Sequence, residues 1–251
     1  MSPLTFDTQL NIILLDIEGT TTPLDFVYKT LFPYASNRIE SFLREHIKEP
    51  EILSIIDQLY RHYQIDKVQE TQLQPWTDET CESLLHSAIA YCQWLMSKDI
   101  KNTALKSLQG KIWEEGYNKG ALRGIVYPDV PPAFERWRQQ KREICIYSSG
   151  SILAQKLLFS TVSSGDLTPH IAAFFDTGIG HKTSTESYRK IAQSLARNPS
   201  DFLFVSDSMK ELRAAHDATM HTILCNRDLR SPELSKERAI IESFHEIFPD
   251  K

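Results

Sequence analysis

Two acidic residues, Asp16 and Glu18, follow directly after the four aliphatic residues Ile12 to Leu15. A buried segment does not tolerate two unpaired charges, because each must be desolvated or paired. Asp207 follows a second apolar run in the same way. Carboxylate oxygens are the ligands of a hard cation such as Mg2+, which takes one or two of them and keeps waters and substrate phosphate for the rest. Asp16, Glu18 and Asp207 are therefore our candidate ligands for a single Mg2+ ion.

A second group of residues suits a phosphate. Ser148, with the backbone amides of Ser149 and Gly150, stands before the expected helix SILAQKLLF, and a helix start of this kind binds anions. Lys182 adds a compact positive charge. A metal, amides and a lysine together neutralise a phosphate dianion and the charge that develops in phosphoryl transfer.

Five short apolar runs of strand length can place these groups: residues 12–15, 143–147, 171–175, 201–205 and 222–225. Four of them are followed by a turn and a helical pattern, which predicts a doubly wound parallel α/β sheet covered on both faces. Ligands bind at the carboxyl ends of the strands in such sheets. The candidate residues follow those ends.

Residues from about Leu24 to Gly120 have a different pattern, with apolar residues recurring every three or four positions. We expect an all-helical cap domain over residues 24–121, inserted into an α/β core made of residues 1–23 and 122–251. Helix breakers flank the insertion, Pro23 on one side and Gly120, Gly124 and Pro128 on the other. They predict two hinges that let the cap close over the strand ends.

The motifs resemble those of the haloacid dehalogenase superfamily. DIEGTT resembles the first motif, IYSSGS the second, Lys182 the third and VSDSMKE the fourth, in the expected order. The insertion falls where the superfamily places its first type of cap. Where many members have a second aspartate in the fourth motif, this chain has Ser208, and Glu211 stands one helical turn further on. We expect Glu211 to hold a metal-bound water, and we leave it out of the metal ligands.

Four longer segments resemble the acireductone synthases, the enolase-phosphatase family of methionine salvage: DIEGTTTPLDFVYKTLFPYA, KIWEEGYNKGALRGIVYPDVPPAF, IYSSGSILAQKLLF and FFDTGIGHKTSTESYRKIA. The resemblance implies that 2,3-diketo-5-methylthiopentyl 1-phosphate is first enolised and then dephosphorylated to the acireductone, with one Mg2+ per chain. It also implies that Asp16 is the nucleophile, forming an aspartyl phosphate that water hydrolyses.

Glu18 stands where most phosphatases of the superfamily have aspartate. Its extra methylene extends the carboxyl group toward the carbon next to the ketone, so we interpret Glu18 as the enolisation base. Lys111 and Glu114 in the helical segment are the alternatives.

Composition limits the partners. The net charge is −5 and the 28 basic residues are dispersed, which disfavours nucleic acid and acidic membrane surfaces. No apolar run approaches the roughly 18 residues of a membrane-spanning helix, and the first residues lack a signal-peptide pattern. We expect a cytoplasmic monomer that acts on a small phosphorylated molecule. Cys81, Cys92, Cys145 and Cys225 have no metal-binding spacing.

Other readings remain. The chain can be a phosphatase or phosphomutase for another phosphate ester, a dehalogenase, which needs neither Glu18 nor a metal, or a binding protein, although such proteins commonly lose the nucleophile. A dinucleotide-binding protein is excluded because no GxGxxG follows the first strand. We interpret Trp76, Trp94 and Trp113, on helical patterns, as packing residues. The histidines at 62, 86, 170, 216 and 221 share no ligand spacing and are interpreted as structural.

Overall fold

The computed structural model describes residues 10–68, 73–227 and 239–249. The chain divides into two compact units, one made of Met1–Val27 and Arg123–Lys251, the other of Tyr28–Leu122.

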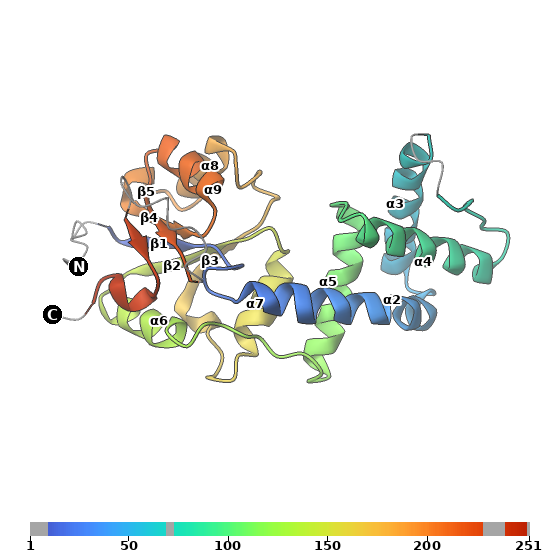
Figure 1. Cartoon of the computed structure of the whole chain (residues 1–251), viewed down its shortest axis with the longest axis horizontal. Helices are drawn as coiled ribbons and strands as arrows, with labels where there is room; N and C mark the ends of the chain where they lie inside the picture. The colour runs from blue at the N-terminus through green and yellow to red at the C-terminus, as the bar shows by residue number, and fades with distance from the viewer. Residues whose placement is uncertain (1–9, 69–72, 228–238, 250–251) are drawn as a thin grey trace. The chain divides into compact units, whose positions relative to one another are not determined.

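The first unit is built on a six-stranded parallel sheet in the order β3-β2-β1-β4-β5-β6 (Figure 1). Its strands are β1 (Ile12–Leu15), β2 (Glu143–Tyr147), β3 (Ile171–Phe175), β4 (Phe202–Ser206), β5 (His221–Cys225) and β6 (Ile240–Ile241). All four residues of β1 are fully buried between β2 and β4, as expected for a strand covered on both faces. The predicted fold class is confirmed.

Helices cover both faces of this sheet: α6 (Val130–Gln139), α7 (Ile152–Ser160), α8 (Thr185–Ser194) and α9 (Met209–Asp217). Because side chains alternate along a strand, Ile12 and Leu14 share one face, where they belong to the same buried cluster as Tyr188 of α8 and Leu212 of α9. Figure 1 shows α8 and α9 on one side of the sheet and α6 and α7 on the other. Short 3-10 turns lie at Thr168–His170, Pro199–Asp201 and Phe244–Glu246.

The strand predictions match the structure closely. The first three strands have the predicted bounds, β4 begins and ends one residue later, and β5 begins one residue earlier. The sixth strand, β6, was not predicted, because two residues are too few for a periodic pattern. It pairs with the end of β5 through Leu224↔Ile240 and Cys225↔Ile241.

The second unit is helical. Its helices are α2 (Phe32–His46), α3 (Pro50–Asp66), α4 (Cys81–Ser97) and α5 (Thr103–Asn118). The short α1 (Leu24–Phe26) and a π-helical turn (Val27–Leu31) precede α2 along the chain. Side chains from all four helices form a separate buried core that includes Ile39, Leu59, Cys92 and Leu108.

Trp76, Trp94 and Trp113 all pack against the core of the helical unit, as predicted. Trp94 and Trp113 also lie on helices as predicted, whereas the predicted helical position is wrong for Trp76. This residue lies in the connection between α3 and α4, where its ring contacts Tyr60, Tyr63 and Tyr91. The tryptophan at this position is therefore explained by its packing against these rings, not by a place in a helical repeat. Trp113 packs on Phe32 and donates a hydrogen bond to the Leu31 carbonyl at 2.8 Å.

Within the described part of the chain, no helix has the length and apolar character needed to cross a bilayer. All four cysteines are free thiols, and three of them are buried.

Candidate active site

Asp16 is held at the carboxyl end of β1. Its backbone N–H donates to the Val205 carbonyl of the neighbouring strand at 3.0 Å, and its Oδ1 accepts the Ile17 N–H at 2.7 Å. The residue is only 2% exposed. The aliphatic run therefore places one carboxylate at the edge of a rigid sheet, as the sequence predicts.

Lys182 and Ser206 bring further groups to Asp16. The Lys182 ammonium contacts Asp16 Oδ1 and forms an ion pair of 2.8 Å with Glu211 Oε2. The Ser206 hydroxyl lies between the two acids, 3.2 Å from Asp16 Oδ2 and 3.1 Å from Glu211 Oε2. The Tyr188 hydroxyl donates to the Lys182 carbonyl at 2.7 Å and anchors that segment. Both oxygens of Asp16 are therefore oriented by fixed donors.

Glu18 has a different partner. The Ser148 hydroxyl, at the end of β2, lies 3.4 and 3.3 Å from the two Glu18 carboxylate oxygens. Ser148 Oγ also accepts the Gly150 N–H at 3.1 Å. The helix α7 that follows is capped by the Ser151 hydroxyl. The structure thus brings the first and second motifs together.

Asp207 lies against the turn that follows Glu18. Its backbone N–H donates to Thr20 Oγ1 at 3.1 Å. Gly19 has a φ of +74°, and a Cβ added there would lie 2.4 Å from Asp207 Oδ2. A glycine is therefore required both by the backbone conformation and by the close approach of the Asp207 carboxylate.

The electrostatics of the site are dominated by negative charge. Burial and the neighbouring Asp16 raise the pKa of both Glu18 and Glu211. Partial burial, with repulsion from Asp16 and Glu211, raises the pKa of Asp207 to about 7. Burial acts to lower the pKa of Lys182, but attraction to the acids outweighs it, so this pKa is raised.

Besides burial, these shifts share a cause, because four carboxyl groups lie near a single ammonium group. A divalent cation would relieve that repulsion and favour the ionised carboxylates. The donor set, carboxylate and hydroxyl oxygens, also fits Mg2+. The residues present thus suit, by their chemistry, the metal ion that the sequence implies, although the ligand atoms of Asp16, Glu18 and Asp207 do not all lie within 4.8 Å of one another.

The predicted residues do not all share one contact network. Asp16 contacts Lys182, Glu18 contacts Ser148, and Asp207 lies against Gly19. Ser149 is exposed. Like charges repel, so the three acidic side chains are held by separate partners.

One residue of the site, Ser206, was not assigned to it from the sequence, and another, Glu211, was expected there in a different role. The position of Ser206 directly before Asp207, within the VSDSMKE motif, was the available signal. Glu211 was expected to hold a metal-bound water, whereas the structure pairs it with Lys182 and Ser206. Its spacing of four residues from Asp207 brings it back toward the same strand end.

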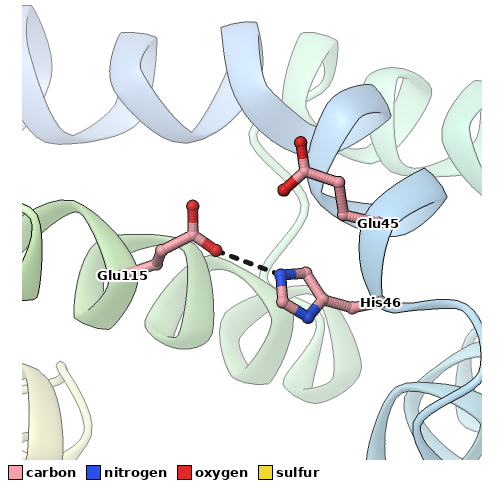
Figure 2. Close-up of side chains that lie close together, drawn as sticks. All are labelled: Glu45, His46 and Glu115. Carbon is pink, nitrogen blue, oxygen red and sulfur yellow. Dashed lines mark hydrogen bonds and ion pairs between the residues drawn. The ribbon is translucent and has the colours of Figure 1, made fainter.

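Another cluster of potential metal ligands lies in the helical unit. Atoms of Glu45, His46 and Glu115 come within 4.8 Å of one another, the only such group among the described residues (Figure 2). Both ring nitrogens of His46 already face carboxylates, with Nδ1 2.6 Å from Glu49 and Nε2 3.1 Å from Glu115. Lys119 also pairs with Glu115 at 2.5 Å. This arrangement is explained as an ion-pair network that joins α2 to α5.

A cavity of about 220 Å³ also lies in the helical unit, between the connection before α4 and α4 itself, and includes Tyr91 and Trp94 in its walls. None of the acids around Asp16 lines it. The α/β unit thus contains the catalytic candidates.

The fold and the site define a class of protein. A family model for haloacid dehalogenase-like hydrolases matches residues 10–219, a span that includes every residue of the site. Hydrolases of this class that act as phosphatases generally use Mg2+.

Individual relatives narrow the class. Enolase-phosphatase E1 of Synechococcus elongatus is 44% identical over 95% of this chain and 98% of its own length. The enzyme of the same name from Drosophila simulans is 39% identical over 95% of this chain and 91% of its own. The crystal structure of the UTR4 protein of Saccharomyces cerevisiae is 31% identical, covers 93% of this chain and 98% of its own, and superposes with a TM-score of 0.74. The chain belongs to the enolase-phosphatase E1 family of haloacid dehalogenase-like hydrolases.

Proposed function

We propose that this protein is a Mg2+-dependent enolase-phosphatase that acts in L-methionine salvage. It converts 2,3-diketo-5-methylthiopentyl 1-phosphate to 1,2-dihydroxy-3-keto-5-methylthiopentene and phosphate. The observation that carries the proposal is the pair of acids at the end of β1, where Asp16 contacts Lys182 and Glu18 contacts Ser148. Two carboxylates in different environments suit two different chemical steps. The identity of the proposed substrate rests on membership of the enolase-phosphatase E1 family.

Asp16 is the proposed nucleophile. One of its oxygens attacks phosphorus, the bond from phosphorus to the substrate oxygen breaks, and that oxygen takes a proton. Water then attacks the aspartyl phosphate, releasing inorganic phosphate and restoring Asp16. Lys182, fixed through Tyr188 and Glu211, holds positive charge beside the attacking carboxylate. Ser148 and Ser149 are the proposed phosphate-binding residues.

Glu18 is the proposed acid and base. Burial and the neighbouring Asp16 raise its pKa, which makes the carboxylate a stronger base toward the carbon next to the ketone. The carboxylic acid formed when it takes that proton can then donate a proton to the leaving oxygen. The alternative base Lys111 forms an ion pair with Glu51 at 2.7 Å. That ion pair engages the Lys111 ammonium group with a partner inside the helical unit.

Asp16, Glu18 and Asp207 are the residues that would hold Mg2+, one ion per chain. When bound, the metal supplies positive charge to the phosphate oxygens.

We assign residues 24–121 as the cap, and residues 1–23 and 122–251 as the catalytic core. We further propose that the enzyme is a cytoplasmic monomer whose only partner is its small phosphorylated substrate, which agrees with the net charge of −5.

The test is to add the diketo phosphate with Mg2+ and follow enol absorbance and phosphate release together. Asp16→Asn should lower phosphate release by at least about a thousandfold. Glu18→Gln should abolish both signals, because enolisation precedes phosphate release. A chelator should remove the activity of the wild-type enzyme.

Two results would contradict parts of the proposal. Rapid hydrolysis of another phosphate ester, without turnover of the diketo phosphate, would favour the alternative of a phosphatase for a different substrate. Full enolisation by Glu18→Gln, with loss of phosphate release alone, would exclude Glu18 as the base. Lys111 and Glu114 would then be the next residues to substitute.

A further inference from the structure

Arg227 follows β5 in the α/β unit and has no role in the chemistry proposed above. Its Nε and Nη2 atoms both donate to the Thr20 carbonyl, at 3.1 and 3.0 Å. Its Nη1 donates to Asp129 Oδ2 at 2.6 Å and to the Glu242 carbonyl at 3.2 Å. One guanidinium therefore joins the segment after β5 to three other segments of the chain, at Thr20, Asp129 and Glu242.

The surroundings of Arg227 are built to hold it in one orientation. The guanidinium carbon lies 4.4 Å from the ring centre of Tyr127 and 4.6 Å from that of Phe244. Asp129 also accepts hydrogen bonds from the Ser243 hydroxyl at 2.8 Å and the Phe244 N–H at 2.5 Å. Burial acts to raise the pKa of Asp129, but the hydrogen bond from Arg227, with those from Phe244 and Ser243, outweighs it and the pKa is lowered. The ion pair is thus charged, and Asp129 Oδ2 accepts three hydrogen bonds.

Stability alone is a weak reason for such a pair. The side chains of Arg227 and Asp129 are only 6% and 9% exposed, and well-packed apolar residues often replace a buried ion pair without loss of stability. What an apolar pair cannot do is direct two parallel N–H donors at one carbonyl oxygen. The geometry at Thr20 therefore needs a separate explanation.

Thr20 links this network to the acidic site. It is fully buried, its carbonyl receives both Arg227 bonds, and its hydroxyl oxygen accepts the Asp207 N–H at 3.1 Å. The preceding residue, Gly19, is the one against which the Asp207 carboxylate packs. If the Thr20 peptide cannot rotate, two contacts of Asp207 are fixed: the hydrogen bond from its N–H to the Thr20 hydroxyl, and the packing of its carboxylate against Gly19.

We propose that Arg227 is a positioning residue for the metal site: through Thr20, it holds the backbone and carboxylate of Asp207 in the orientation that binds Mg2+. Arg227 touches neither substrate nor metal. The inference rests on the proposed function only in taking Asp207 as a metal ligand. It concerns affinity for the metal and can be measured without substrate.

The experiment measures Mg2+ binding calorimetrically, without substrate, alongside kcat, KM and the unfolding temperature. Arg227→Met should raise the Kd for Mg2+ by about tenfold, the usual effect of losing an outer partner of a metal ligand, and should lower kcat at subsaturating Mg2+ with KM changed less than twofold. Arg227→Lys keeps the charge but cannot supply the paired donors, so its Kd should lie between those of Arg227→Met and the wild type.

Ser243→Ala is the matched control. It removes one hydrogen bond from Asp129 in the same buried network but leaves both Arg227 bonds to Thr20 in place. It should lower the unfolding temperature and leave the Kd for Mg2+ within twofold of wild type. If the Arg227→Met variant folds, has a lower unfolding temperature and still binds Mg2+ with the wild-type Kd, then Arg227 has only a structural role. That result would overturn the proposal.

Thr20→Val decides the question if Arg227→Met does not fold. Valine keeps the shape of the side chain and removes the acceptor of the Asp207 N–H, so the Kd for Mg2+ should again rise by about tenfold. An unchanged Kd in this variant would refute the proposal. A wild-type protein that binds Mg2+ but does not turn over the diketo phosphate would instead refute the proposed substrate and leave the role of Arg227 standing.

Discussion

At the scale of single residues, Gly19 shows how closely the turn after β1 is fitted to the acidic site. Gly19→Ala introduces a side chain where φ is +74° and where Asp207 Oδ2 would lie 2.4 Å from the new Cβ. The left-handed backbone alone costs about 1–2 kcal/mol with alanine. In addition, the Asp207 carboxylate must move, so we expect phosphate release at limiting Mg2+ to fall by about tenfold or more. Urea unfolding and a phosphate assay measure the two effects separately.

Gly120→Ala provides a matched control for this prediction. Gly120 has a φ of +70°, almost the same as that of Gly19, but nothing lies within 4 Å of an added Cβ. The Gly120→Ala variant should therefore lose a similar amount of unfolding free energy, while the Mg2+ dependence of its phosphate release should change little. Equal effects of both substitutions on activity would mean that the contact with Asp207 is unimportant.

At the scale of elements, His46 in the last turn of α2 ties this helix to α5 through Glu115 (Figure 2). The hydrogen bond with Glu49 raises the pKa of His46, burial opposes that rise, and Glu115 adds to it. Because the folded-state pKa lies above the unfolded value, the stabilisation is fully present below about pH 6.5 and is lost as the pH rises through the folded-state pKa. His46→Gln should therefore lower the unfolding free energy by about 0.5–1 kcal/mol at pH 5.5, and by much less at pH 9.

His62→Gln is the control for this pH dependence. His62 also lies on a helix of the same unit, α3, but is exposed. Its substitution should change the unfolding free energy little at either pH, as expected for a surface position. A loss for His46→Gln that does not diminish with rising pH would show that the imidazolium charge is not responsible.

The elements show what the sequence could predict. Short apolar runs gave three strands with their observed bounds and two more within one residue, because buried parallel strands are continuous apolar segments. The rule that strand ends meet at one edge of the sheet also predicted that Asp16 and Lys182 come together. β6 and the π-helical turn before α2 were beyond this reasoning, because neither has a repeating pattern.

Contacts between distant residues set the limit of prediction within the site. Glu211 and Ser206 belong to it because α9 turns back onto the end of β4, and Arg227 reaches Thr20 across more than 200 residues of sequence. A single sequence contains local spacing but not these pairings. Likewise, the need for glycine at position 19 arises from Asp207, which only the folded chain brings near.

At the scale of the whole molecule, the two units differ in how the chain builds them. Tyr28–Leu122 is one continuous segment with its own buried core. We therefore predict that a fragment of residues 28–122 folds alone, with a helical circular dichroism spectrum and a cooperative urea transition. Leu108→Asp, which places a charge in that core, should abolish the transition. A wild-type fragment with no cooperative transition would show that the helical unit depends on the α/β unit.

The position of β1 in the sheet has a consequence for synthesis of the chain. β1 is made early, yet its two neighbours, β2 and β4, begin only at Glu143 and Phe202. At about 5–20 residues per second, a ribosome takes on the order of ten seconds to reach them, long enough for the helical segment to fold first. During that interval the nascent chain carries the apolar strand IILL without a partner on either side. The strand that bears the proposed nucleophile therefore depends on protection by chaperones until both of its neighbours have been made.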